Sequence, residues 1–326
     1  MKWGAQLPQM GQPFDRESVM GFARAIEAAG FHSGWTSDHV CWPSRIDSKY
    51  PYTDDGSFLA ASDLPWLDVI ATQCFVAGCT ERLRLGFSVL ILPYRQPVVT
   101  AKQLATLDVL SGGRLIVGCG IGWMREEAAI LGMPFDHRGA RSDEQLALFE
   151  TLFRDPTPRF DGRFYQLPEV GFEPKPLQNP VPVWVGGSSA AACRRAARFG
   201  TGFHAAFEPL PRAAGFWREV RDAARDLGRD PDELTFSMRL YLDPDGRMPA
   251  AKSIAGSHQQ MQDRVGALSE AGVSHVLLDP VVAIDDPRDR LQAQLELLTG
   301  FVADVGGPAR VRAGDDADSA NRSHQD

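Results

Sequence analysis

Lysine is scarce in this chain, and its distribution argues against one kind of chemistry. Only five of the 34 lysine and arginine residues are lysine, at positions 2, 49, 102, 175 and 252. None follows a predicted strand, where a barrel enzyme would hold an imine-forming lysine, so an aldolase of that type is disfavoured. With 42 acidic residues the formal net charge is −8. A negative surface repels phosphate backbones and anionic lipids, so we expect no nucleic-acid partner and no membrane partner.

Cysteine and histidine are few and scattered. The five cysteines are odd in number and lie without CxxC spacing, which indicates reduced thiols rather than a disulfide framework. The seven histidines form neither an HxH pair nor an HExxH motif, so we expect no metal site. A GxSxG elbow and a Walker loop are also missing. The chemistry of an enzyme with this sequence would have to come from an organic cofactor.

Long apolar runs are missing as well. No run approaches the roughly 18 residues of a membrane span. Residues 1–30 lack the basic and apolar regions of a signal peptide. We therefore expect a cytoplasmic protein.

What the sequence does contain is a regular alternation of short apolar runs and segments of helical period. The predicted strands are residues 2–7, 33–37, 83–91, 114–118, 182–185, 202–205, 234–241 and 275–278. The predicted helices are residues 16–29, 66–78, 97–110, 124–132, 141–153, 189–199, 211–227, 258–271 and 287–302. Eight βα units close a barrel, so the predicted fold class is α/β, a (β/α)8 TIM barrel. We expect residues 1–305 to form this single domain and residues 306–326 to form a disordered tail.

Two insertions interrupt the alternation. A long loop after strand 2, residues 40–65, is rich in turn residues yet carries aromatic side chains, and we interpret it as a lid. An excursion between strands 4 and 5, residues 154–182, contains seven prolines and a hairpin turn predicted at Asp161-Gly162. A linker between two domains is the alternative interpretation of this second stretch.

Catalytic groups of such barrels follow the carboxyl ends of the strands. The residues predicted there are Pro8-Gln9, Asp38-His39, Ser88-Val89, Gly118–Trp123, Gly186-Gly187-Ser188, His204 and Asp279. His39 stands beside a carboxylate and could exchange a proton near neutral pH, although a histidine that only caps the loop would have the same sequence signal. His204 is a second candidate by the same reasoning.

Two glycine-rich turns follow strands. Gly186-Gly187-Ser188 precedes a predicted helix, and such a turn offers backbone N–H groups and a helix dipole to a phosphate. An ordinary turn with a serine N-cap is the alternative. Around Gly120 the glycines are not spaced as GxGxxG, so a Rossmann site is disfavoured, and close approach of a flat ligand or a sharp turn explains them better.

Four stretches together resemble the bacterial luciferase-like flavin and deazaflavin oxidoreductases, most closely the branch that uses coenzyme F420. They are Thr36–His39 (TSDH), Leu85–Pro97 (LGFSVLILPYRQP), Gly113–Glu127 (GRLIVGCGIGWMREE) and Pro182–Ser188 (PVWVGGS). The resemblance extends over residues 1 to about 300. It implies a TIM barrel that holds a flavin-like ring system at its carboxyl-terminal mouth, and a homodimer.

The resemblance also implies roles for individual residues. Ser88-Val89 matches the position of a non-prolyl cis peptide that bulges behind the ring, and Gly120 lies in the matching glycine stretch. Gly186, Gly187 and Ser188 match the phosphate-binding turn. Asp38 and His39 match the pair beside the reactive carbon, where the histidine serves as proton donor, proton acceptor or charge stabiliser.

One departure limits this transfer. Several dehydrogenases of the F420 branch carry an acidic glutamate after the strand-4 glycines, whereas this chain has Trp123. Either Glu126 or Glu127 reaches the site, or His39 acts alone, or the substrate needs no proton from the protein. Trp42, Trp123 and His204 are the candidate substrate-pocket residues, and the alternative for the loop aromatics is that they only pack the loop onto the barrel.

The expected function is an F420-dependent oxidoreductase that passes a hydride between the deazaflavin and a small organic substrate. The main rival is an FMN-dependent monooxygenase that uses O2, and in either case a partner reductase could supply the reduced flavin or F420. A non-catalytic cofactor-binding module is a rival of another class, and a cofactor-free sugar-phosphate isomerase or lyase is a more distant one.

Overall fold

The structure, a computed structural model, describes residues 1–11, 14–53, 55–58 and 63–306. Apart from Gly306, the predicted tail 306–326 lies outside the described residues. Among the described residues, no helix is both long and apolar enough to cross a membrane.

Eight parallel strands close into a barrel, as predicted. They are β1 (Lys2–Gln6), β2 (Ser33–Thr36), β3 (Arg84–Phe87), β5 (Leu115–Gly120), β8 (Val183–Gly186), β9 (Gly202–Ala206), β10 (Thr235–Asp243) and β12 (His275–Pro280). Each pairs in parallel with the next, and β12 pairs back onto β1, with Trp3 opposite Val276. This is the (β/α)8 TIM barrel that the alternation of the sequence predicts.

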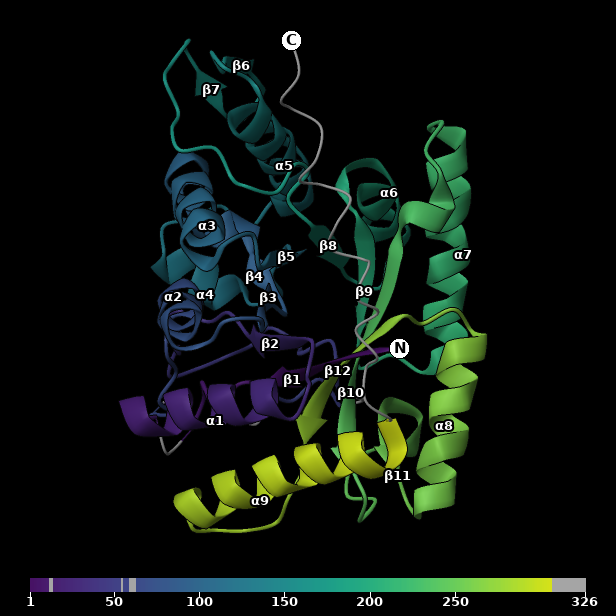
Figure 1. The fold of residues 1–326 in the computed structure, drawn as a ribbon. Helices are drawn as coiled ribbons and strands as arrows, with labels where there is room; N and C mark the ends of the chain where they lie inside the picture. The colour runs from purple at the N-terminus through teal and green to yellow at the C-terminus, as the bar shows by residue number, and fades with distance from the viewer. Residues whose placement is uncertain (12–13, 54, 59–62, 307–326) are drawn as a thin grey trace, which may run out of the picture.

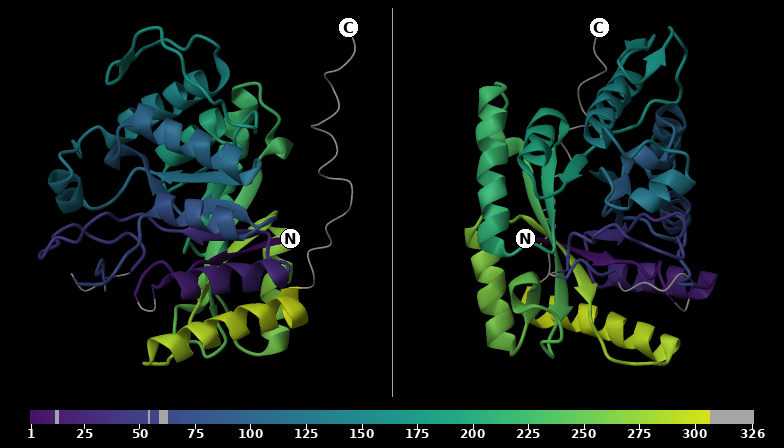
Figure 2. Two further views of the ribbon diagram at one scale, coloured as in Figure 1. Left: turned by 60° about the vertical axis from the view of Figure 1, so that its left-hand side comes forward. Right: turned by 180° about the vertical axis from the view of Figure 1, so that it is seen from behind.

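Helices surround the barrel (Figures 1 and 2), and α1 and α9 run side by side. The helices of the described chain are α1 (Arg16–Ala28), α2 (Val69–Cys79), α3 (Pro97–Ser111), α4 (Arg125–Ile130), α5 (Arg138–Arg154), α6 (Ala190–Phe199), α7 (Leu210–Asp226), α8 (His258–Glu270) and α9 (Pro287–Phe301). Their boundaries have local causes. The Asp15 side chain accepts the Ser18 N–H at the start of α1, and Gly112 ends α3 with a φ of +70°.

The interior of the barrel is filled around one indole. Trp35 is fully buried and packs with Ile116, Trp184 and Leu277. A Cβ on Gly4 would lie 2.5 Å from the Trp35 Nε1 atom, and Gly86 faces the same ring. Glycine in these strands therefore makes room for a large side chain at the barrel axis.

The predicted strand 83–91 is divided in the structure. β3 ends at Phe87, the Ser88–Val89 peptide is cis, and the short β4 (Leu90–Ile91) then pairs with β5. The cis peptide that the resemblance implies is thus present. β5 in turn ends two residues later than predicted, so Gly118 and Gly120 lie within the strand and not in the turn after it.

The excursion after α5 carries a small sheet of its own. β6 (Phe160–Asp161) and β7 (Gln166–Leu167) form the predicted hairpin beside α5 (Figure 1), but the turn is residues 162–165, because Asp161 still pairs with Gln166. Three further short elements had no clear signal in the sequence. They are the 3-10 helices η2 (Pro231–Glu233) and η3 (Ala250–Lys252), and strand β11 (Ser253–Ala255), which extends the sheet beyond β10. Two others adjoin predicted elements, namely η1 (Leu92–Tyr94) after β4 and η4 (Val302–Gly306) after α9.

Candidate active site

His39 and Glu127 form a hydrogen-bonded pair at the carboxyl-terminal mouth of the barrel. His39 follows β2, and Glu127 lies on α4, the helix after β5. The His39 Nδ1 atom is 2.7 Å from Glu127 Oε2, and the two side chains are 9% and 0% exposed. Sequence reasoning left open which glutamate reaches the site, and the structure brings Glu127 to His39.

Glu127 is held as a carboxylate. Its Oε1 atom accepts the backbone N–H groups of Val40 and Cys41, at 2.6 and 3.3 Å. Burial raises the pKa of Glu127, but the hydrogen bonds from His39 and from the backbone outweigh it, and the pKa falls below its ordinary value. A carboxylate accepts only, so His39 donates from Nδ1, which leaves Nε2 as the nitrogen free to exchange a proton.

Asp38, the neighbour of His39, faces another way. Its carboxylate forms an ion pair with both Nη atoms of Arg95 and accepts the Ile91 N–H at 2.8 Å. Burial raises the pKa of Asp38 and the Arg95 guanidinium opposes the rise. We expected Asp38 beside the reactive carbon of a cofactor. In the structure its oxygens link the start of the loop after β2 to β4 and to Arg95.

Three of the expected cofactor residues meet at one point of the mouth. Val89, after the cis peptide, projects over the ends of β5 and β8. A Cβ on Gly120 would lie 2.6 Å from Val89 Cγ2, and one on Gly186 would lie 3.1 Å from Val89 Cγ1. The missing side chains of these glycines leave room for the apolar Val89 side chain at the barrel mouth.

Beside Val89, the predicted phosphate-binding turn leads into α6. Gly187 has a φ of +127°, a conformation that favours glycine. Ser189, rather than Ser188, is the N-cap, and its hydroxyl accepts the Ala192 N–H at 3.2 Å. The earlier N–H groups of the helix have no partner within it, so the turn can bind an anion at the carboxyl end of β8.

Sequence reasoning missed a buried arginine, Arg239, that contacts the backbone of the cis peptide. Arg239 of β10 pairs with Asp279 of β12 at 2.7 and 3.2 Å, and its Nη1 atom donates to Ser88 O at 2.8 Å and to Ser37 Oγ at 2.9 Å. Burial lowers the pKa of Arg239, but Asp279 reverses the effect and raises it. Arg239 lies inside a strand, so no motif marked it. Asp279, predicted to follow its strand, lies within β12.

Aromatic side chains from the 40–65 loop, from residue 66 and from the segment after β5 surround His39. Its ring lies 4.4 Å from that of Trp42, 5.8 Å from Phe58, 5.3 Å from Trp66 and 6.1 Å from Trp123, centroid to centroid. The candidate residues Trp42 and Trp123 thus do meet at His39. Trp66 was predicted to begin a helix, but α2 begins at Val69 after an Asp68 N-cap, which leaves Trp66 in the loop.

His204 is buried beneath the mouth, opposite Gly186 in the sheet. The sequence placed it at the end of its strand, whereas it lies in the middle of β9, is fully buried, and contacts Ser88 and Ser237. A group buried in the barrel interior cannot line a substrate pocket, so that expectation is corrected.

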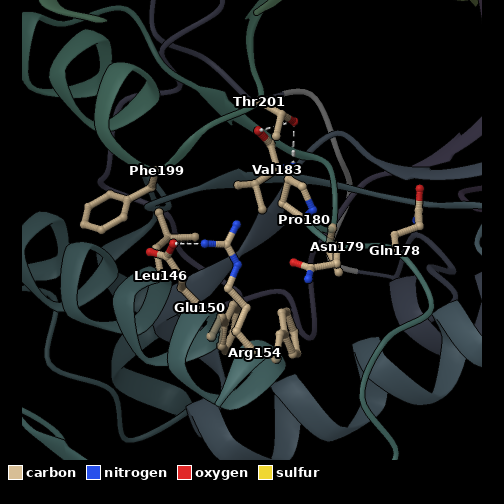
Figure 3. A pocket seen from close by; sticks show the side chains of 12 residues that line it. Leu146, Glu150, Arg154, Gln178, Asn179, Pro180, Val183, Phe199 and Thr201 are labelled. Carbon is tan, nitrogen blue, oxygen red and sulfur yellow. Dashed lines mark hydrogen bonds and ion pairs between the residues drawn. The ribbon is translucent and has the colours of Figure 1, made fainter. Parts of the chain in front are cut away.

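Two hollows of the described surface lie away from this site. One, of about 70 Å³, opens at the amino-terminal ends of β8 and β9 beside α5, with the Glu150–Arg154 ion pair along its wall (Figure 3). The other, of about 420 Å³, lies between α6 and α7 and is lined by Arg194, Arg195 and Arg198 among others. Neither includes His39 or Ser88, and among the described residues no group of three metal-ligating side chains is present.

Comparison with known sequences gives the family. Residues 3–314 match the family described as luciferase-like monooxygenase. The chain is 38% identical over 204 residues to an uncharacterized protein of Mycobacterium tuberculosis. The matched residues cover 62% of this chain and 70% of the relative. The chain is 30% identical over 237 residues to an F420-dependent glucose-6-phosphate dehydrogenase of Nakamurella multipartita, 71% of this chain and 65% of that one.

Comparison with solved structures confirms the fold. The monooxygenase RslO1 from Streptomyces bottropensis superposes with a TM-score of 0.75 at 20% identity, over 93% of this chain and 99% of that one. An F420-dependent secondary alcohol dehydrogenase in complex with an F420-acetone adduct superposes with a TM-score of 0.74 at 16% identity, over 93% and 98%. With the family match over almost the whole chain, the protein belongs to the luciferase-like monooxygenase family and is an oxidoreductase of that family.

Proposed function

We propose that this protein is an F420-dependent oxidoreductase in which His39 gives or takes the proton that accompanies hydride transfer. The observation that carries the proposal is the His39–Glu127 pair at the barrel mouth, since a carboxylate that fixes one imidazole nitrogen leaves the other free for proton exchange. The F420 branch of the resemblance and the F420-dependent relatives at about 30% identity support the choice of cofactor.

The residues present fit a flavin-like cofactor. Val89, seated against Gly120 and Gly186, offers an apolar face to a ring, and the Gly186–Ser188 turn at α6 offers N–H groups to a phosphate. When bound, the deazaflavin supplies a carbon that accepts or donates a hydride.

The protein would supply the rest of the chemistry. His39 Nε2 would exchange the proton with the substrate, and the Glu127 carboxylate would stabilise the imidazolium formed when that nitrogen is protonated. Trp42, Phe58 and Trp66 would shield His39 from water and so strengthen its electrostatic interactions.

We further propose that the substrate is uncharged, in contrast to a sugar phosphate. The guanidinium groups of the half-buried Arg95 and the buried Arg239 are each paired with aspartate. A phosphate there would have to compete with Asp38 or Asp279 for its cation, whereas the rings around His39 favour an apolar or aromatic compound. Glucose 6-phosphate is therefore expected neither to bind nor to reduce F420 above the background rate.

The proposal is tested first by titration of the purified protein with F420 and, separately, with FMN, following the absorption of each chromophore. Tighter binding of F420 supports the proposal, and tighter binding of FMN would support the monooxygenase alternative. A screen of uncharged aldehydes, ketones, alcohols and quinones with oxidised or reduced F420 then identifies a substrate. His39→Ala should lower turnover of that substrate far more than it weakens F420 binding, and unchanged turnover would remove His39 from its role.

We also propose a homodimer and a separate reductase that supplies reduced cofactor, as the family resemblance implies. Light scattering on the purified chain measures the first. Dependence of turnover on an added F420 or flavin reductase measures the second.

A further inference from the structure

A chain of hydrogen bonds crosses the barrel interior and ends at Ser88. Ser33 Oγ lies 2.8 Å from His275 Nε2, and His275 Nδ1 lies 3.1 Å from Ser237 Oγ. Ser237 Oγ lies 2.9 Å from His204 Nδ1, and His204 Nε2 lies 2.9 Å from Ser88 Oγ. The five residues come from β2, β12, β10, β9 and the bulge after β3. All are buried, and Ser88, at 5%, is the most exposed.

Both ends of this chain contact groups that can only donate. The Trp35 indole N–H donates to Ser33 Oγ at 2.8 Å, and the Arg239 Nη1 atom donates to Ser88 Oγ at 3.3 Å. Neither an indole nor a guanidinium has an acceptor atom. The terminal hydroxyls therefore cannot give their own protons to these neighbours.

The two histidines within the chain are neutral. Burial, together with the nearby charge of Arg239, lowers the pKa of His204 to about 3. Burial also lowers the pKa of His275 well below its ordinary value, and His32 acts in the same direction. A neutral imidazole has one N–H and one acceptor nitrogen, and in both rings each nitrogen already faces a serine hydroxyl.

The number of protons then restricts the arrangement. Five groups carry one proton each, but the four links between them use only four. Because every imidazole nitrogen lies in a link, the spare proton belongs to a hydroxyl, that of Ser33, Ser237 or Ser88. Ser33 and Ser237 are 0% exposed, and among the described residues their hydroxyls contact only the neighbours already named. A buried donor without an acceptor is costly, so the spare proton is least unfavourable at Ser88, at the mouth.

We propose that the chain donates in one direction, from Ser33 to Ser88, and that the Ser88 hydroxyl thereby presents its proton at the barrel mouth to an acceptor atom of the cofactor ring system. In this arrangement Ser33 donates to His275, His275 donates from Nδ1 to Ser237, Ser237 donates to His204, and His204 donates from Nε2 to Ser88. Ser237, His204 and His275 are positioning residues, because they set the direction of the Ser88 proton without touching the ligand. The contact with the cofactor rests on the proposed function, whereas the direction of the chain does not.

The direction can be measured without any cofactor, because it fixes the tautomers. We expect long-range proton–nitrogen NMR correlations of the full chain with 15N-labelled histidine to show His204 as the Nε2–H form and His275 as the Nδ1–H form, assigned with His204→Asn and His275→Asn. A His204 ring in the Nδ1–H form would overturn the proposal, since Ser88 would then have to donate inward.

A matched pair of variants tests the coupling. Ser237→Ala removes the two middle links, to His275 and to His204, and should leave the two rings as mixtures of tautomers. Ser142→Ala removes an equally buried hydroxyl, on α5, that donates to Arg138 O and lies outside the chain, and it should leave both tautomers unchanged. Unchanged tautomers in Ser237→Ala would show that the rings are set independently and would overturn the coupling.

Binding tests the role of Ser88. Ser88→Ala should weaken F420 binding, measured by fluorescence titration, about three- to tenfold, the range expected for one neutral hydrogen bond. Ser88→Thr, which keeps a hydroxyl, should recover most of the affinity. Equal affinity for the alanine variant would overturn the donor assignment. If F420 fails to bind the unaltered protein, the proposed function fails, while the tautomer measurement still decides the direction of the chain.

Discussion

Replacing Glu127 by glutamine should reverse the tautomer of His39. The amide oxygen of the glutamine can still accept the N–H groups of Val40 and Cys41, which Glu127 Oε1 accepts at 2.6 and 3.3 Å. The amide NH2 group then faces His39 Nδ1, where Glu127 Oε2 now lies at 2.7 Å. Since an NH2 group only donates, Nδ1 must accept and the ring proton must move to Nε2.

The expected loss follows from the type of hydrogen bond. A charge-assisted hydrogen bond contributes about 1.5–3 kcal/mol. If it stabilises the imidazolium form in the transition state, its loss lowers turnover about ten- to hundredfold, at 1.36 kcal/mol for each factor of ten. Glu127→Asp keeps the charge on a shorter side chain and should recover part of the loss.

Two measurements check this reasoning. NMR of 15N-labelled histidine should show His39 as the Nδ1–H form in the unaltered protein and as the Nε2–H form in Glu127→Gln. Turnover of F420 with the substrate found by screening gives the rate. Glu150→Gln, the same change at an exposed site on α5 at the opposite end of the barrel, is the matched control and should leave the rate unchanged. Full activity of Glu127→Gln together with a reversed tautomer would refute the role of the pair.

The same pair makes stability depend on pH. The pKa of Glu127 is lowered in the folded protein, below its ordinary value of 4.5. A lowered pKa contributes stability that is present above the unfolded value and is lost as the pH falls through the folded value. The difference in free energy of unfolding between the unaltered protein and Glu127→Gln should therefore shrink as the pH falls below about 4.5. Denaturant titrations at several pH values measure it, and a difference that grows below that pH would contradict the assignment.

Two further substitutions test the mouth. Gly120→Ala places a methyl group 2.6 Å from Val89 Cγ2, so it should lower the free energy of unfolding by about 1–3 kcal/mol. It should also displace Val89 enough to weaken F420 binding. The control Gly21→Ala, with open space around it in α1, should be neutral or stabilising. Arg239→Met leaves Asp279 unpaired and should destabilise by about 3–5 kcal/mol, and adding Asp279→Leu should restore much of that loss. Chemical denaturation measures both sets. A tolerated Gly120→Ala, or a double variant no better than Arg239→Met alone, would show that these contacts matter less than their geometry indicates.

The strands and helices of the barrel could be predicted because their signals are local. Eight apolar runs alternate with helical periods, and proline and glycine mark most of the ends. The predictions that failed concern element boundaries, which depend on single residues. The strand predicted over 83–91 looks continuous in hydrophobicity, and only the peptide geometry at Ser88–Val89 divides it. The sequence predicts that a helix begins at Trp66, whereas in the structure the Asp68 side chain caps α2, which begins at Val69.

Only those site residues that lie at or just after the end of a strand could be predicted from the sequence. His39, Val89 and the Gly186–Ser188 turn satisfy that rule, and the structure places them at the mouth. Arg239 and His204 lie inside strands, where position in the sequence does not distinguish a polar core residue from a site residue. Their partners are contributed by strands more than 30 residues away, and only the closed barrel brings them together.

The carboxylate of Glu127 also bears on which residues of the 40–65 loop can be substituted. One of its oxygens orients the imidazole, and the other holds the first two residues of the 40–65 loop. The start of the 40–65 loop and the imidazole of His39 are thus anchored by the same side chain, on α4, a helix outside both. We therefore expect loop residues beyond Cys41 that do not contact His39 to tolerate substitution without moving the imidazole.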